Sequence, residues 1–215
     1  MTLTEVEGVQ YELFDINELH EMAVMTAEAF SRYEPVTSAL GISVEDFTDF
    51  VKLLGPKVEY EELTVIARSQ DTKQIIGAMI ADDFAIEQPE EIRRLGDKFE
   101  PVWAILDELD TRYKQGMVFP KGKYLHLLLG AVNHQHNGKN IAKNLIKICL
   151  ENGVRKGYKR GFGEATGVVS QHILRKFGFV DCFEIPYKTF SFQGRKVFES
   201  IKVHHSIILM DKALV

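Results

Sequence analysis

The chain has 215 residues, of which 45% are hydrophobic and 27% are charged, and its formal net charge is -5. This composition is typical of a globular protein and excludes a disordered one, and the length leads us to expect a single domain over residues 1–215. Because the chain is acidic and contains no run of five basic residues, we expect neither a nucleic-acid partner nor an anionic membrane surface as a partner.

The cysteines and the N-terminal segment indicate the compartment. Cys149 and Cys182 lie far apart, without a CxxC or Cys/His metal spacing, which is typical of a reducing compartment. The segment MTLTEVEGVQYELF has no signal-peptide character, and no 18 consecutive apolar residues occur. We therefore expect a cytoplasmic protein that does not span a membrane, present as a monomer or a homodimer.

The first half of the chain predicts one strand, two helices and a hairpin. Alternation favours a strand over 9–14, and apolar residues at helical spacing favour a helix over 16–30. After the turn-prone link SRYEPVTSALG, a second helix is expected over 43–56, ending at a Gly-Pro pair. The runs 63–68 and 74–81, joined by SQDTKQ, predict an antiparallel strand pair.

A helical insertion and a buried strand follow. The apolar stripe within 82–123 predicts a helical insertion, whose Phe99, Trp103 and Tyr113 could form apolar walls of a pocket. The run YLHLLLGAV, 124–132, is almost continuously apolar and of strand length. It therefore predicts a central strand covered on both faces.

Strand and helix then alternate to the end of the chain. The expected elements are a helix over 138–152, a strand over 159–165, a helix over 168–177, a strand over 179–186, and one or two strands around Gln193-Gly194. Together these elements predict a mixed α/β fold, in which helices flank a twisted sheet.

The segment VNHQHNGKNIAKNL joins the central strand to its helix. The start of a helix has backbone N–H groups without intrahelical partners and a partial positive charge, which suits phosphate. Gly138 permits close approach of the backbone, Asn140 tolerates a positive φ, and Lys139 and Lys143 add positive charge. The junction therefore suits a diphosphate, although Gly and Asn here are also ordinary capping residues.

This junction resembles the acetyl-coenzyme-A loop of the GNAT acyltransferase superfamily, and the order of the elements extends the resemblance over nearly the whole chain. The family's loop reads Arg or Gln, two residues, Gly, one residue, and Gly or Ala. Asn137-Gly-Lys-Asn140-Ile-Ala142 fits at its last position and departs at Asn137 and Asn140. The resemblance implies acetyl-CoA as cosubstrate and a strand that splays from its neighbour near Val132. The cofactor-binding residues that it implies are Ala131, Val132, Asn133, Asn137, Gly138, Lys139, Asn140, Ile141, Ala142 and Lys143.

Two further segments are similar to the insect arylalkylamine N-acetyltransferase branch of that superfamily. AFSRYEPVT is similar to its Ala-Phe-x-x-x-Glu-Pro segment, whose Glu is a base acting through ordered water, so Glu34 is the candidate base. The other reading of Glu34 is a solvated acid on a turn. The branch also implies that Thr166 or Ser170 serves the departing thiolate, and Ser170 is preferred because Thr166 could be a helix N-cap. The tyrosine that many GNAT enzymes use for this step is replaced by Leu174.

Acetyl transfer to an amine requires a proton acceptor, a polarised thioester carbonyl and a partner for the thiolate. We therefore predict an acetyl-CoA-dependent N-acetyltransferase that acts on a small primary amine with a carboxylate base. An acetyltransferase of protein lysines or N-termini and a CoA-binding sensor without turnover stay open as alternatives. Neither the His134/His136 nor the His204/His205 pair has a carboxylate or cysteine at ligand spacing, so no metal is expected.

Overall fold

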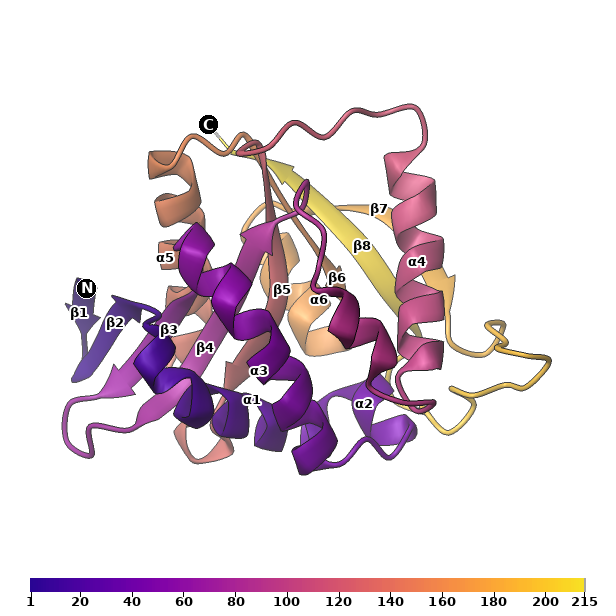
Figure 1. Cartoon of the computed structure of the whole chain (residues 1–215), viewed down its shortest axis with the longest axis horizontal. Coiled ribbons are helices and arrows are strands. Elements are labelled where there is room, and N and C mark those ends of the chain that lie inside the picture. The colour runs from indigo at the N-terminus through magenta and orange to yellow at the C-terminus, as the bar shows by residue number, and fades with distance from the viewer. Residues whose placement is uncertain (215) are drawn as a thin grey trace.

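The computed structural model describes residues 1–214 and contains one eight-stranded sheet with helices on both faces (Figure 1). The strands are β1 (Thr2–Val6), β2 (Val9–Leu13), β3 (Val65–Ser69), β4 (Ile75–Asp83), β5 (Tyr124–Val132), β6 (Arg160–Ala165), β7 (Val180–Pro186) and β8 (Ser206–Ala213). Their order in the sheet is β1-β2-β3-β4-β5-β6-β8-β7. Only β5 and β6 run parallel, so the mixed α/β class is confirmed.

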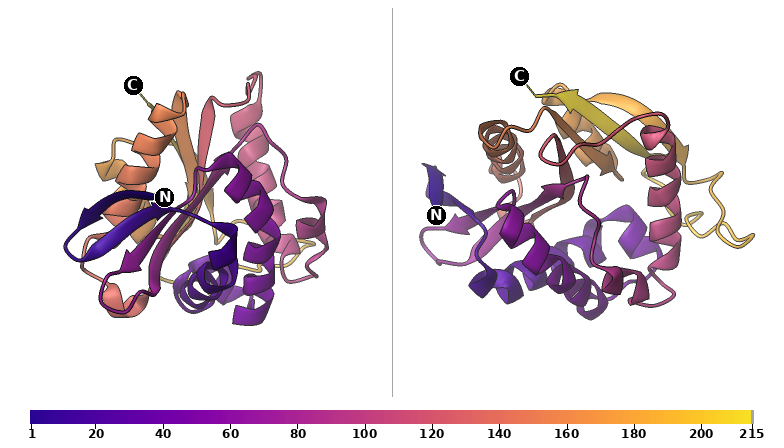
Figure 2. Two further views of the ribbon diagram at one scale, coloured as in Figure 1. Left: turned by 60° about the vertical axis from the view of Figure 1, so that its left-hand side comes forward. Right: turned by 45° about the horizontal axis from the view of Figure 1, so that its top comes forward.

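The helices divide between the two faces of the sheet, as Figure 2 shows. They are α1 (Leu19–Tyr33), α2 (Pro35–Ala39), α3 (Val44–Glu61), α4 (Glu100–Lys114), α5 (Ile141–Arg155) and α6 (Val168–Lys176), with short 3-10 segments η1 (Ile16–Glu18), η2 (Glu90–Arg94) and η3 (His134–His136). Helix α5 buries Leu145 and Cys149 against one face of the sheet. Helices α1 and α3 bury Met22 and Val51 against the opposite face. None of the helices among residues 1–214 has both the length and the apolar character needed to cross a bilayer.

The second helix does not end at the Gly-Pro pair, and this expectation was wrong. Helix α3 passes through Pro56 and stops at Glu62, which adopts a left-handed φ of 53°. A Cβ atom at Gly55 would lie 2.6 Å from a methyl group of Leu19, so this glycine permits close packing of α1 on α3 rather than termination. Burial of Val58 on the following turn favours continuation despite the lost hydrogen bond at Pro56.

Three other departures from the expected elements occur. Strand β1 was not predicted, because its residues are mostly exposed and it is held as an edge strand by pairing with β2. The link before α3 contains the short helix α2. Around Gln193-Gly194 the chain forms an isolated bridge between Phe192 and Arg195 instead of a strand pair, and the final strand is β8.

The gap between β5 and β6 positions the site. These strands pair at only three positions, from Tyr124 with Arg160 to His126 with Phe162, although both continue beyond them. On the other side of β5, the register with β4 shifts so that Leu128 is an extra residue, and such a bulge bends a strand. The two strands therefore diverge, as the resemblance implied.

Candidate active site

A cavity of about 1080 Å³ opens where β5 and β6 diverge, and helices α1, α2, α3, α4 and α6 contribute to its walls. Phe50, Phe99 and Trp103 form an apolar part of this wall and pack on one another, with ring centroids 5.5 to 5.8 Å apart. Phe99 and Trp103 thus lie where the sequence placed them. Tyr113 does not line the cavity, because its ring stacks on Phe162 and its hydroxyl donates to Asp211. The volume suits a small molecule, with polar groups at a few points of an apolar wall.

Glu34 lines the cavity between α1 and α2. Its carboxylate caps α2 by accepting the backbone N–H groups of Val36, at 3.1 Å, and Thr37, at 2.6 Å. Pro35 occupies the first turn of α2, where its missing N–H costs nothing. The residue is half-buried rather than the fully solvated acid of the alternative reading. Capping fixes the direction of the carboxylate, and each oxygen keeps a lone pair for water or substrate.

The helix start at α6 differs from the expected one. Its N-cap is Gly167, not Thr166, and the Ser170 hydroxyl takes part in the cap by accepting the Gly167 N–H at 3.3 Å and donating to the Gly167 carbonyl at 2.9 Å. The argument that capping explains Thr166 better than Ser170 was therefore wrong. Among residues 1–214, the Thr166 hydroxyl makes no side-chain hydrogen bond, and both residues line the cavity.

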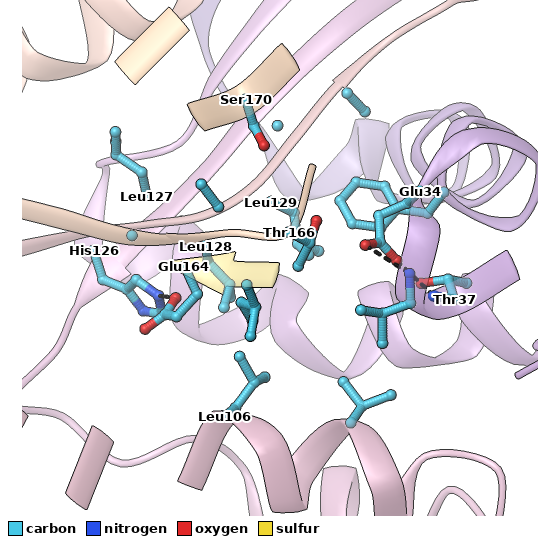
Figure 3. Close-up of a pocket in the computed structure, with 18 of the residues that line it drawn as sticks. Glu34, Thr37, Leu106, His126, Leu127, Leu128, Leu129, Glu164, Thr166 and Ser170 are labelled. Carbon is cyan, nitrogen blue, oxygen red and sulfur yellow. Dashed lines mark hydrogen bonds and ion pairs between the residues drawn. The ribbon is translucent and has the colours of Figure 1, made fainter. Parts of the chain in front are cut away.

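His204 and Pro35, the residue after Glu34, both lie against the start of α6. The Nδ1 atom of His204 accepts the N–H of Val168 at 3.2 Å. A Cβ atom at Gly167 would lie 3.3 Å from His204 Nδ1 and 3.6 Å from Pro35 Cγ, so a glycine lets these three segments meet. Thr166 and Glu34 consequently project into the same cavity (Figure 3).

A buried ion-pair network reaches the cavity from the sheet. His126 on β5 is clamped between two carboxylates: its Nδ1 lies 3.0 Å from Asp82 and its Nε2 lies 2.9 Å from Glu164 on β6. Lys57 of α3 lies 2.6 Å from the other oxygen of Asp82, and 3.1 Å from Glu61. Figure 3 shows His126 and Glu164 together on one side of the cavity, and Glu34 on the other.

The charges of this network follow from its geometry. Burial alone would lower the pKa of His126, but the carboxylates of Glu164 and Asp82 outweigh it and raise the pKa to about 10. Burial likewise favours neutral Asp82, yet His126 and Lys57 outweigh it and lower that pKa to about 2. At neutral pH His126 is therefore an imidazolium, which both carboxylates need because neither is exposed.

The network was missed in the sequence, although two signals point to it. Apart from Tyr124 at its start, His126 is the one polar side chain in the expected strand YLHLLLGAV, and Asp82 and Asp83 directly follow the expected apolar strand 74–81. A polar residue in such a run is buried, and a buried charged group needs a partner. The partners of His126 could not be named, because Glu164 lies 38 residues away and reaches it only through the β5–β6 pairing.

The junction after β5 has a backbone suited to a diphosphate. Gly138 has a φ of 82° and Asn140 a φ of 57°, so the chain makes two left-handed steps before α5 begins at Ile141. No side-chain cap of α5 is present within the described chain, so its first N–H groups face outward. Lys139 and Lys143 are exposed, and Lys143 Nζ donates to Asn140 Oδ1 at 3.0 Å.

Four of the expected cofactor-binding residues line the cavity. Ala131 and Val132 lie at the end of β5, Asn137 lies in the loop, and Ala142 lies in α5. Ile141 contributes only its backbone, because its side chain is buried in the core. Asn133 donates its N–H to Ile76 at 2.9 Å, so that group is not available to an acetyl carbonyl. Because successive peptide groups of a strand alternate in direction, the N–H groups of Val132 and Gly130 face the gap instead.

These donors fit acetyl-CoA. The left-handed backbone, the outward N–H groups of α5 and the two lysines suit a diphosphate, and an open slot between β5 and β6 leads from there into the cavity. His134 also lines the cavity and lies with its ring centroid 6.0 Å from that of Tyr33. Within residues 1–214, no three His, Cys, Asp or Glu side chains are placed to hold a metal ion.

The chain was compared with family models and with solved structures. No family model matches the sequence. The structure is similar to the C-terminal condensation domain of Ebony in complex with beta-alanyl-dopamine, with a TM-score of 0.86, 15% identity, and coverage of 95% of this chain and 98% of that one. It is also similar to arylalkylamine N-acetyltransferase 2 from Aedes aegypti, with a TM-score of 0.80, 19% identity, and coverage of 97% and 100%. The structure is similar as well to the polyamine N-acetyltransferase of Drosophila melanogaster, with a TM-score of 0.76, 17% identity, and coverage of 96% of this chain and 100% of that one. The fold is that of the GNAT N-acetyltransferases, over nearly the whole chain.

Proposed function

We propose that this protein transfers an acetyl group from acetyl-CoA to a small primary amine bound in the cavity. One observation supports this function above the others: the gap between β5 and β6 connects a helix start suited to a diphosphate with the cavity that the Glu34 carboxylate lines. Similar structures include enzymes whose names state acetylation of arylalkylamines and polyamines. The two free cysteines fit a cytoplasmic location.

In this proposal acetyl-CoA supplies the thioester, and the protein binds it, orients it and moves two protons. The first N–H groups of α5, with Lys139 and Lys143, bind the diphosphate. The N–H groups of Gly130 and Val132 face the thioester carbonyl and stabilise the negative charge that develops on its oxygen.

Glu34 takes the proton of the acceptor ammonium through a water molecule. Its two capping bonds hold the carboxylate towards the cavity, and half-burial limits the water around it. His126 cannot perform this step near neutral pH, because the raised pKa of about 10 keeps it protonated.

The departing thiolate needs a hydrogen-bond donor at the α6 end of the cavity. Thr166 is now the better candidate than Ser170, because the Ser170 proton is already donated to the Gly167 carbonyl. Ser170 would have to leave the cap in order to act. Leu174, at the position of the tyrosine in many GNAT enzymes, lines the cavity and offers no proton.

Acetylation of a protein lysine or N-terminus is a weaker reading, because α4 forms part of the cavity wall, whereas a polypeptide substrate requires an open groove. A sensor without turnover would need no carboxylate in the cavity, and Glu34 is such a carboxylate.

The test combines binding with turnover. Calorimetric titration with acetyl-CoA, compared with dephospho-CoA, measures the cofactor site, and thiol release in the presence of an amine panel measures transfer. We expect Glu34→Gln to lower kcat/KM by about 10²- to 10⁴-fold and to leave acetyl-CoA affinity unchanged. Glu28→Gln, an exposed change of the same kind on α1, is the control. Binding of acetyl-CoA without thiol release from any amine would favour the sensor, and no binding would refute the proposal.

A further inference from the structure

The cavity has a second charged end, opposite Glu34. Glu164 of β6, clamped by His126 of β5, lies on the side of the cavity away from Glu34 (Figure 3). Asp110 of α4 lines the cavity as well and pairs with Lys114 at 3.0 Å. Nothing in the acetyl-transfer steps above uses this end.

Glu164 is built to present one oxygen atom to a ligand. Its side chain is only 8% exposed, and Oε2 is held by the His126 imidazolium at 2.9 Å. No hydrogen bond to the other oxygen, Oε1, occurs within residues 1–214, and that atom is not among the buried polar atoms without a partner. Because Glu164 lines the cavity, Oε1 opens into it. Oε1 is thus the accessible, unpaired oxygen of a carboxylate that is otherwise buried, and it requires a hydrogen-bond donor.

The clamp fixes the direction of the Glu164 carboxylate. His126 is itself held from behind by Asp82, which in turn pairs with Lys57. Phe162 stacks on the His126 ring at 4.7 Å with an interplanar angle of 6°, so the imidazolium cannot rotate away. Glu164 is therefore rigidly positioned from the sheet.

Asp110 approaches from the opposite wall. Burial raises its pKa, and the negative charge of Glu164 raises it further. The two carboxylates thus act on each other at this end of the cavity. Lys114 pairs with Asp110 and His126 pairs with Oε2 of Glu164, which leaves Oε1 of Glu164 without a cation among residues 1–214. A ligand cation placed between them would relieve that repulsion and supply the donor that Oε1 lacks.

We propose that this end binds a positively charged group of the acceptor, distant from the amine that is acetylated, with Glu164 as its principal contact and Asp110 as a second. The acceptor class is then a diamine or an amino-guanidine rather than a simple monoamine. The inference rests on the proposed acetyl transfer and adds the residues that select the substrate.

The experiment compares two acceptors that differ only in the distal charge, 1,5-diaminopentane and n-pentylamine. Thiol release gives kcat/KM for each. A charge-assisted hydrogen bond of about 1.5 kcal/mol corresponds to about tenfold, so we expect the wild type to prefer the diamine by about tenfold or more. In Glu164→Gln the preference should fall below about threefold, with pentylamine turnover little changed. Asp110→Asn, on a more exposed side chain, should reduce the preference in the same direction.

Glu108→Gln is the matched control, because this residue lies on α4, pairs with Arg112 at the surface and does not line the cavity. It should keep the wild-type preference. Equal kcat/KM values for the two amines in the wild type would overturn the inference. The same fall in kcat/KM for both amines in a folded Glu164→Gln would also overturn it.

Calorimetric titration with each amine separates this inference from the proposed reaction. If acetyl-CoA gives no turnover with either amine, acetyl transfer is refuted. Tighter binding of the diamine than of pentylamine that is lost in Glu164→Gln would still support the cation site. Equal binding of the two amines would refute the cation site.

Discussion

Replacing His126 by Phe removes the positive charge from between Asp82 and Glu164 and retains an aromatic ring to stack on Phe162. The side chains of Asp82 and Glu164 are 0% and 8% exposed, so little water reaches the oxygens that face the imidazolium. Asp82 keeps Lys57, whereas Glu164 has no other paired cation in the described part of the chain. The substitution therefore isolates the electrostatic contribution of a single buried group.

The expected cost follows from the pKa. A folded pKa of about 10 lies some three units above neutrality, and about 1.4 kcal/mol per unit gives a loss of about 4 kcal/mol at pH 7. The range of about 3–5 kcal/mol for breaking a buried ion pair agrees with this value. Because the folded pKa is raised above the unfolded value of 6.5, the stabilisation is complete below pH 6.5 and is lost as the pH rises towards 10.

The assay is urea unfolding followed by fluorescence of Trp103, the only tryptophan of the chain. The free energy of unfolding of His126→Phe should be about 4 kcal/mol lower than that of the wild type at pH 7. This difference should be smaller at pH 9.5. A variant that also has Asp82→Asn and Glu164→Gln should recover at least about 2 kcal/mol, because the two side chains that faced the imidazolium are then neutral, while Lys57 keeps Glu61. A loss below about 1 kcal/mol at pH 7, or a loss independent of pH, would show that the imidazolium does not hold the network together.

The remaining predictions concern the start of α6, the loop before α5 and the stability of the protein at low pH. Ser170→Ala should cost about 0.5–2 kcal/mol of unfolding free energy through the lost cap, and thiol release should change less than threefold; a loss of about 100-fold would return the thiolate role to Ser170. Thr166→Val should instead lower kcat with little change in stability, and unaltered kcat would exclude this residue. Gly138→Ala places a side chain at a φ of 82°, so calorimetry should show weaker acetyl-CoA binding and unfolding a loss of about 1 kcal/mol; unchanged values would exclude this loop as the cradle. Because the pKa of Asp82 is lowered to about 2 from 3.8, its contribution is complete above pH 3.8 and is lost as the pH falls through 2. Urea midpoints between pH 5 and pH 2 should therefore fall more steeply in the wild type than in Asp82→Asn, and parallel curves would contradict that assignment.

The sequence determined the parts of this protein that depend on local pattern. The bounds of β5 were predicted to the residue, because an uninterrupted apolar run is visible in any context. The start of the second helix at residue 43 is confirmed, and Ser43 caps it with a full capping box, because capping depends on residues three positions apart. The left-handed φ of Asn140 confirms the tolerance expected of that residue, since this preference belongs to the side chain itself. Glu34 and Thr166 line one cavity, while the roles that the resemblance implied for them stay predictions.

Only the tertiary structure decided which charged groups meet. His126 and Glu164 are brought together by the register that pairs His126 with Phe162, and Asp82 is opposite His126 in the β4–β5 pairing. Hydrophobic periodicity shows that a residue is buried but does not show its partner, because strand order and register result from packing of the whole sheet. The same reason explains Gly55-Pro56, where contact with Leu19 and burial of the next turn, both remote from the local signal, determine that α3 continues.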